Sequence, residues 1–265
     1  MGNGKKYEIG VKLWSVNTGI CLQEVRQLCD EGLCDYVELY AVPGSLGTLP
    51  FWQELRVPCV IHAPHFKHGF NLALAEQAVH NRCLYEETRR FADALAARYI
   101  IFHGGTFGHI AETARQLAAL QEPRALIENK PAITRNAGAV LECRGSTIAE
   151  IEQVMGAVGC GFCLDIPHAL CAANYHGSGQ GDTLRAFSAL GPTMYHLADM
   201  MDAAQLVDDH TPLGQGNLDM SRYIPAILPP GARVTIETNR RRLDSLAEFR
   251  SEMAWLREFL CEQGC

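Results

Sequence analysis

The sequence predicts an α/β fold of the (β/α)8 TIM-barrel class, built as a single domain over residues 1–265. The first observation is an alternation along the chain of short apolar runs, rich in β-branched residues, with longer segments of helical periodicity. This alternation is typical of parallel strands that are connected by helices. The second is the length of 265 residues, which is close to the usual size of such a barrel, about 250 residues.

Eight short apolar runs are the predicted strands. They cover residues 7–13, 36–40, 59–65, 99–105, 125–129, 161–168, 194–199 and 233–238. Several of these runs are apolar at successive positions, which is typical of strands in a parallel sheet that is buried on both faces. We therefore expect the strands to pair in parallel with helices outside them.

Four of the intervening segments show the clearest helical periodicity: residues 72–97, 110–122, 146–158 and 243–264. Ser146 begins an S-x-x-x-E stretch that is close to a capping pattern. A doubly wound sheet is the alternative α/β fold, and it would place a glycine-rich phosphate turn after the first strand. The segment there reads KLWSVNTG and lacks G-x-G-x-x-G, so the barrel is the better prediction.

The composition excludes several classes of protein. With 48% hydrophobic residues the chain is too apolar for a disordered protein. No apolar run reaches the ~18 residues of a membrane span, and the start MGNGKKYEIG lacks the apolar core of a signal peptide. We therefore expect a cytoplasmic protein without a membrane partner. The formal net charge of −7 argues against a protein that binds nucleic acid through its overall charge.

The cysteines are predicted to be reduced and mostly buried. There are 11 of them, an odd number, scattered through a chain that is large enough to bury its own core. Cys160 and Cys163 have the C-x-x-C spacing of redox and zinc motifs, but they lie inside the apolar run VGCGFCLD and no second pair completes a four-thiolate site. We interpret both as core residues.

Polar side chains crowd the ends of the predicted strands. In chain order they are His62, His65, His103, Glu128, Asp165, His168, His196 and Glu237. Asp208, Asp209 and His210 lie in the loop after the seventh strand, just before the glycine turn LGQGN. Because the carboxyl ends of barrel strands meet at one face, we expect these side chains to face one pocket. Imidazole mixed with carboxylate, without cysteine, suits zinc, manganese or iron.

Seven segments of the chain resemble endonuclease IV and the wider xylose isomerase-like barrel superfamily. In order along the chain they are APHFKHGFNL, FHGG, IEN, CLDIPHA, HLAD, DDHTPLGQGNLD and IET. They extend from the third predicted strand to the eighth, and DxH followed by LGQGN is the most specific of them. The first strand and the loop after the second match poorly.

The resemblance implies a trinuclear zinc site with nine ligands: His65, His103, Glu128, Asp165, His168, His196, Asp208, His210 and Glu237. One ion would be shared by His65, His103 and bridging Glu128. The second would be held by Glu128, Asp165, His196 and Glu237. The third would be held by His168, Asp208 and His210. His62 and Asp209 lie outside this pattern and are expected to be neighbours of the site.

Charge arithmetic on the residues also favours several ions. Four clustered carboxylates carry −4, and some of them would take up protons unless cations compensated them. Three divalent ions carry +6 and would leave a net charge of +2, which favours an anionic substrate. Such a site suits the hydrolysis of phosphoesters.

The first functional hypothesis is a zinc-dependent phosphodiester hydrolase, which by resemblance would cleave DNA at abasic sites. Its catalytic residues would be Glu128, which orients the attacking water between two ions, and Glu237. Basic residues near the same face are candidates for binding the substrate phosphate: Lys67, Lys130, Arg240, Arg241 and the adjacent Arg242.

Two departures from the family pattern argue for a substrate smaller than duplex DNA. The loop after the second strand, AVPGSLGTLP, is short and carries no charged or large aromatic side chain to insert into a duplex. In the third loop, His68 occupies the position of a family tyrosine. A smaller phosphoester is therefore an alternative substrate.

The second hypothesis is a sugar or sugar-phosphate isomerase or epimerase. It needs a single ion, Mn²⁺ or Mg²⁺, held by Glu128, Asp165, His196 and Glu237, with a glutamate as acid and base. Trp14, Phe66 and Phe107 could then be apolar walls against a sugar. An isomerase has no chemical need for four further ligands, and their presence favours hydrolysis: His65, His103, Asp208 and His210. A barrel that only binds a ligand or a structural metal is a third hypothesis.

Overall fold

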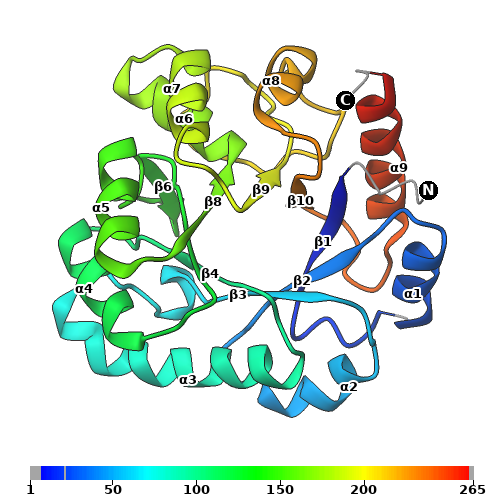
Figure 1. Cartoon of the computed structure of the whole chain (residues 1–265), viewed down its shortest axis with the longest axis horizontal. Coiled ribbons are helices and arrows are strands. Elements are labelled where there is room, and N and C mark those ends of the chain that lie inside the picture. Colours follow the sequence, from blue (N-terminus) through cyan, green and yellow to red (C-terminus); the bar gives the residue numbers. More distant parts are fainter. Residues whose placement is uncertain (1–6, 21, 263–265) are drawn as a thin grey trace.

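The computed structural model describes residues 7–20 and 22–262, and its strands close into a barrel (Figure 1). Within these residues eight parallel strands follow the order β1-β10-β9-β8-β5-β4-β3-β2 around the barrel. They are β1 (Glu8–Trp14), β2 (Tyr36–Tyr40), β3 (Cys59–His62), β4 (Ile100–His103), β5 (Ala125–Glu128), β8 (Gly161–Asp165), β9 (Met194–Leu197) and β10 (Arg233–Ile236). The predicted (β/α)8 barrel is confirmed.

Helices connect the strands and surround the barrel in Figure 1. They are α1 (Leu22–Asp30), α2 (Leu49–Gln53), α3 (Ala78–Ala94), α4 (Ile110–Leu120), α5 (Ile148–Val158), α6 (Ile166–His176), α7 (Gln180–Ser188), α8 (Met220–Ile227) and α9 (Ala247–Glu262). Short 3-10 helices lie in three of the loops: η1 (Leu46–Thr48), η2 (Phe66–His68) and η3 (Ala75–Gln77).

The first long helix begins later than predicted. Residues 72–97 have helical periodicity throughout, but α3 begins at Ala78. The reason is that Asn71 ties the preceding segment to the loop after β4: its Nδ2 donates to the carbonyl oxygen of Thr106 at 2.9 Å, and its Oδ1 accepts from the amide of Ala73. Tertiary hydrogen bonds therefore hold this segment outside the helix.

The N-cap of α5 is Thr147, one residue after the predicted Ser146. The Thr147 hydroxyl accepts from the amide of Glu150, and the Glu150 carboxylate accepts from the amides of Gly145 and Ser146. The pattern T-x-x-E is that of a capping box, but the Glu150 carboxylate binds the two amides before the N-cap and not the amide of Thr147 itself.

A small antiparallel hairpin was not predicted. It consists of β6 (Ile133–Asn136) and β7 (Ala139–Glu142) and lies between β5 and α5. Ala137 and Gly138 both have positive φ, as the central residues of a type I′ turn do. Its strands are mostly exposed and lack an apolar alternation, so hydrophobic patterning gives no signal for them.

The barrel interior has an apolar layer below a polar one. The apolar layer is a cluster of buried residues from six strands: Tyr36, Val60, Ile101, Leu126, Cys163 and Met194. Two residues further along the same strands come Glu38, His62, His103, Glu128, Asp165 and His196. Because side chains alternate along a strand, residues two apart face the same side. The apolar layer therefore forms the floor of the barrel interior, directly beneath the polar side chains.

The interpretation of the C-x-x-C pair as core residues is confirmed. Cys163 belongs to the interior floor, and Cys160 packs against the outer core between strands and helices. Cys21 and Cys265 lie outside the described residues, as do residues 1–6, on which the expectation about a signal peptide depends. Among the helices that the structure describes, none is long and apolar enough to cross a membrane.

Candidate metal centre

The residues that could hold metal ions form four groups at the carboxyl ends of the strands, and three of the groups share residues with one another. Within each group one ligand atom of every residue lies within 4.8 Å of the others. In the described part of the chain the groups are His62, His103 and Glu128; Glu128, Asp165 and His168; His168, Asp208 and His210; and Glu38, His196 and Glu237. They contain eight of the nine ligands that the resemblance implies, and they add His62 and Glu38.

Glu128 lies at the middle of the centre and is fully buried. Its Oε2 is 3.1 Å from Nε2 of His62 and 3.0 Å from Nε2 of His103. Its other oxygen, Oε1, is 3.1 Å from Nδ1 of His168. A carboxylate with imidazole rings beside both oxygens is suited to bridge two cations.

The start of α6 positions two residues of the centre together. Asp165 ends β8 and is the N-cap of α6, where its Oδ1 accepts from the amide of His168 at 2.7 Å. Pro167 in the first turn favours this abrupt change from strand to helix. His168 is thereby placed beside both Asp165 and Glu128.

The loop after β9 carries the third group toward His168. Asp208 Oδ2 lies 3.0 Å from Nδ1 of His210 and 3.5 Å from Nε2 of His168. His210 adopts a left-handed backbone conformation with φ of 48°. The amide of His210 donates to Oδ1 of Asp208, which stabilises this turn.

Asp199 holds the glycine turn that follows. Its carboxylate accepts from the amides of Gly214, Gly216 and Leu218. A Cβ on Gly216 would lie 2.4 Å from Oδ1 of Asp199, so the loop requires glycine there. The motif LGQGN thus folds around one buried carboxylate and keeps the preceding Asp208 and His210 in place.

Four histidines of the centre have one ring nitrogen hydrogen-bonded to an oxygen atom, a backbone carbonyl in three of them and the Glu38 carboxylate in the fourth. The Nδ1 atoms of His62, His168 and His210 lie 2.7 Å, 3.0 Å and 3.0 Å from the carbonyl oxygens of Ala63, Asn129 and Glu237. His196 uses Nε2 toward Glu38 at 2.9 Å. Because these oxygens only accept, each ring donates there, and its other nitrogen is the one that could bind a cation. Metal-binding histidines are oriented in this way.

Several buried atoms of the centre make no hydrogen bond within the described residues. They are Oε1 of Glu38, Nδ1 of His103, Nδ1 of His196, Oδ2 of Asp208 and Oε2 of Glu237. The His196 and Glu237 atoms lie only 2.8 Å apart. Leaving a buried polar atom unsatisfied costs about 1–3 kcal/mol, and a cation bound between such atoms would remove this cost. The donor set of imidazoles and carboxylates therefore fits zinc or a similar ion.

The electrostatics of the centre separate neutral from charged groups. Burial lowers the pKa of His65 and of His103 well below the ordinary value, so both rings are neutral near pH 7. Burial raises the pKa of Asp165 to about 6. Burial opposes ionisation of Asp208, but the charge of His210 and its hydrogen bond lower the pKa of Asp208 to about 2.

His65 lies beside the four groups rather than within one. Its ring stacks on His103 with ring centroids 5.6 Å apart, and its Nδ1 accepts from the amide of Lys67. Asp209 also lies outside the groups, where it accepts from the Thr211 hydroxyl at 2.9 Å.

Sequence reasoning missed two charged residues of the centre, Lys12 and Glu38. Lys12 Nζ lies 2.5 Å from Oε1 of Glu237 and 3.6 Å from Oε1 of Glu38. Lys12 and Glu38 are single charged residues inside predicted apolar strands. Such a residue has no motif around it, and only its inward position in the barrel would have indicated that it belongs to the site.

The basic residues that were predicted to bind phosphate lie at different places. Lys130 is inside the centre, with Nζ 3.4 Å from Oε1 of Glu128. Lys67 and Arg240 line a cavity of about 280 Å³ over the centre. Arg241 lines a separate cavity on the flank, and Arg242 pairs with Asp244 at the surface.

One wall of the cavity over the centre is aromatic. Trp14 is 42% exposed and stacks on Tyr40, with ring centroids 5.1 Å apart. The Tyr40 hydroxyl lies 2.7 Å from Nδ1 of His68, and His68 meets the Trp14 ring edge-on. Phe66 and Phe107 are not among the described residues that line this cavity. The aromatic wall thus consists of Trp14 and Tyr40.

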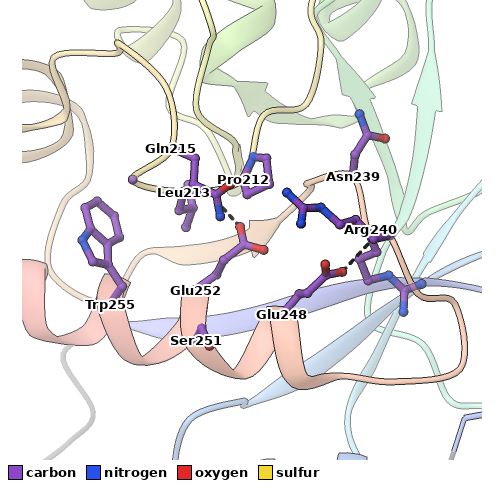
Figure 2. A pocket seen from close by; sticks show the side chains of 11 residues that line it. Pro212, Leu213, Gln215, Asn239, Arg240, Glu248, Ser251, Glu252 and Trp255 are labelled. Atoms are coloured by element: carbon purple, nitrogen blue, oxygen red, sulfur yellow. Dashed lines mark hydrogen bonds between the residues drawn. The ribbon is translucent and has the colours of Figure 1, made fainter.

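The flank cavity, of about 540 Å³, lies between α9 and the loops after β9 and β10 (Figure 2). Glu252 and Trp255 extend from α9 toward the loop that carries Pro212 and Gln215. Glu252 accepts from the amide of Leu213 at 2.9 Å. These contacts connect the last helix to the glycine turn.

Known proteins resemble this chain in sequence and in fold. A family model described as "Xylose isomerase-like TIM barrel" matches residues 51–259. The chain belongs to this family. A probable endonuclease 4 of Mycobacterium bovis is 30% identical over 211 residues, which cover 75% of this chain and 80% of that protein.

Solved structures of xylose isomerase-like barrels resemble this one over nearly its whole length. Endonuclease IV from Thermus thermophilus has a TM-score of 0.67 and 21% identity, and covers 95% of this chain and 99% of its own. D-allulose 3-epimerase from Methylomonas sp. has a TM-score of 0.64 and 13% identity, and covers 99% and 100%. At these identities the likeness shows the fold, which both kinds of protein share. Membership of the family is therefore compatible with hydrolysis and with isomerisation.

Proposed function

We propose that this xylose isomerase-like barrel is a phosphoester hydrolase with a multinuclear zinc centre. The observation that carries the proposal is the third group, His168, Asp208 and His210, which lies next to Glu128 and Asp165 and shares His168 with them. An isomerase needs one ion to polarise a carbonyl, whereas phosphoester hydrolysis gains from ions beside both the attacking and the leaving oxygen. The endonuclease 4 relative supports the same choice.

We assign the metal ligands as the nine residues of the family pattern: His65, His103, Glu128, Asp165, His168, His196, Asp208, His210 and Glu237. His62 is an additional candidate, because its Nε2 faces Glu128 and its other nitrogen is hydrogen-bonded to a carbonyl oxygen. When bound, divalent zinc lowers the pKa of a coordinated water and neutralises charge on a phosphoryl group.

The side chains around the centre have separate proposed roles. Glu128 and Glu237 are the catalytic carboxylates, and Glu128 orients the attacking water from its central position. Lys67 and Arg240, which line the cavity, and Lys130, inside the centre, hold the phosphate oxygens. The substrate is abasic DNA or a smaller phosphoester.

A metal-dependent isomerase or epimerase of a sugar or sugar phosphate is the second candidate. It is favoured by the small cavity, about 280 Å³, with the exposed ring of Trp14 at its wall. In this case one Mn²⁺ or Mg²⁺ would be held by Glu128, Asp165, His196 and Glu237.

A direct comparison of substrates tests the proposal. The zinc-loaded protein would be incubated with a duplex that contains one abasic site and with bis(p-nitrophenyl) phosphate, and the manganese-loaded protein with a panel of ketoses. We expect strand cleavage or release of nitrophenol, and about three zinc ions per chain by elemental analysis. A single bound ion together with epimerised ketose would refute hydrolysis.

His210→Ala should discriminate further, because His210 belongs to the third group alone. Losing a residue that only orients a ligand costs up to about 100-fold in activity, and losing a ligand itself should cost at least as much. We therefore expect the hydrolysis rate to fall by at least about 100-fold and one ion to be lost. His109→Ala, at an exposed histidine outside the centre, is the matched control. Glu237→Gln should abolish activity under either candidate function. Unchanged hydrolysis in His210→Ala would contradict the assignment.

A further inference from the structure

Lys12 and Glu38 form a buried ion pair at the edge of the metal centre. They are directly opposite each other in the register of β1 and β2. The Glu38 side chain is fully buried and that of Lys12 is 9% exposed. Taking two charges out of water is costly unless both are paired and hydrogen-bonded. Their burial inside the barrel mouth is therefore favourable only if other groups of the centre also contact them.

Glu38 determines which nitrogen of His196 is free. Its Oε2 lies 2.9 Å from Nε2 of His196 and accepts from the Thr235 hydroxyl at 2.7 Å. A carboxylate in this position accepts, so Nε2 of His196 donates to it and Nδ1 is the nitrogen left to bind a cation. That Nδ1 atom points toward Oε2 of Glu237.

Lys12 determines which oxygen of Glu237 is free. Its ammonium donates to Oε1 of Glu237 at 2.5 Å and also lies 3.6 Å from Oε1 of Glu38. The remaining oxygen of Glu237, Oε2, is buried and makes no hydrogen bond within the described residues. The two free atoms, 2.8 Å apart, are thus each aimed by a different member of the ion pair.

We propose that Lys12 and Glu38 are positioning residues that direct His196 and Glu237 to one metal ion, with Glu237 restricted to its Oε2 atom. The inference rests on the metal centre of the proposed function, but it is independent of whether the reaction is hydrolysis or isomerisation. Partners of this kind contribute about 10–100-fold to metal affinity.

The test uses cobalt(II), whose visible absorption reports its coordination, in the full-length protein. Lys12→Met keeps the length of the side chain and removes its charge, and Glu38→Gln keeps the shape and removes the carboxylate. We expect each to weaken the affinity for one ion by about 10–100-fold, measured by competition with a chromophoric chelator. The absorption of Lys12→Met should also weaken, because Glu237 can then bind through both oxygens and raise the coordination number.

Two matched variants control for the change of charge alone. Lys67→Met removes a lysine from the same cavity, one that makes no ion pair with a carboxylate of the centre among the described residues. Glu8→Gln removes a carboxylate from the far end of β1. Both should keep the affinity and the cobalt spectrum of the wild type. The double variant Lys12→Met, Glu38→Gln leaves no unpaired charge and is measured if a single variant fails to fold.

The outcomes separate this inference from the proposed function. A wild-type protein that binds neither zinc nor cobalt would contradict the metal centre itself. If the wild type binds both metals, and the variants at Lys12 and Glu38 have the same metal affinity and the same cobalt spectrum as the wild type, only the positioning role is overturned.

Discussion

Two buried glutamates near the carboxyl ends of the strands show how surroundings set the charge of a residue. Burial opposes ionisation of Glu128, but the interaction with the His103 ring, which hydrogen-bonds to it, and the charge of Lys130 outweigh burial and hold the pKa of Glu128 well below the ordinary value. Glu252 is 5% exposed and accepts hydrogen bonds from the Leu213 amide and the Thr238 hydroxyl. Burial outweighs these two bonds and raises the pKa of Glu252 to about 7. Glu128 is an anion suited to bind cations, whereas Glu252 is partly protonated at neutral pH.

Glu252→Gln should change how stability depends on pH. Below about pH 4.5 the folded and unfolded states both hold the proton. Between about pH 4.5 and 7 the unfolded state ionises while the folded state keeps it, so the wild type loses stability as pH rises, by up to about 3 kcal/mol. Glutamine can accept from Leu213 and donate to Thr238 without this loss. Urea unfolding should show that the unfolding free energy of the variant, relative to that of the wild type, is higher at pH 8 than at pH 5.

Glu248→Gln is the control for this measurement, since it makes the same chemical change on α9 at a more exposed position. It should show a much smaller pH effect. An equal pH dependence in the wild type and Glu252→Gln would contradict the role given to Glu252.

At the scale of the elements, helix starts serve two purposes. Asp165 caps α6 and is at the same time a candidate ligand, so the start of α6 and the centre depend on one carboxylate. Thr147 caps α5 through the amide of Glu150 and belongs to none of the groups. The two caps have the same hydrogen-bond pattern, in which the side chain accepts from the amide three residues later. Only the cap that also ends a barrel strand has a place in the metal centre.

Thr147→Ala should cost about 1 kcal/mol of unfolding free energy, the usual value of an N-cap hydroxyl. The amide of Glu150 would lose its partner, while the centre would be unaffected. Thermal unfolding is expected to show a midpoint lower by about 2–4 °C, with zinc binding as in the wild type. Thr147→Ser keeps the hydroxyl and should stay close to the wild type; a loss as large as that of alanine would argue against capping.

At the scale of the whole molecule, the centre joins strands from around the entire barrel. The grouped residues come from β2, β3, β4, β5, β8 and β9, from the start of α6 and from the loops after β9 and β10. Their carboxylates repel one another, and Lys12 and Lys130 offset part of this charge from within. A cation bound there would link distant segments of the chain and relieve the repulsion.

Zinc should therefore stabilise the fold strongly. A ligand present at about a thousandfold excess over its dissociation constant contributes about 4 kcal/mol per site, which for a barrel of this size raises the unfolding midpoint by several degrees. The measurement is thermal unfolding after chelation and again after zinc is restored. Calcium, which prefers oxygen ligands, should have much less effect. Equal midpoints with chelator and with zinc would contradict a metal centre.

Most of the centre could be predicted because its residues end strands. His103, Glu128, Asp165 and His196 each follow an apolar run, and a barrel brings such ends together. Lys12 and Glu38 could not be predicted in the same way. Each is a single charge in a short strand, and the partner Glu237 lies 225 residues from Lys12.

The sequence by itself determined the eight strands, the four helices α3, α4, α5 and α9, and most of the polar residues at the strand ends. These features are local, because side-chain alternation and helical periodicity act over a few residues. Only the tertiary structure decided that His62 faces Glu128, that His65 lies beside the groups, and that Lys12 and Glu38 contact Glu237 and His196. The register between strands distant in the chain sets these contacts, and register depends on the packing of the whole barrel.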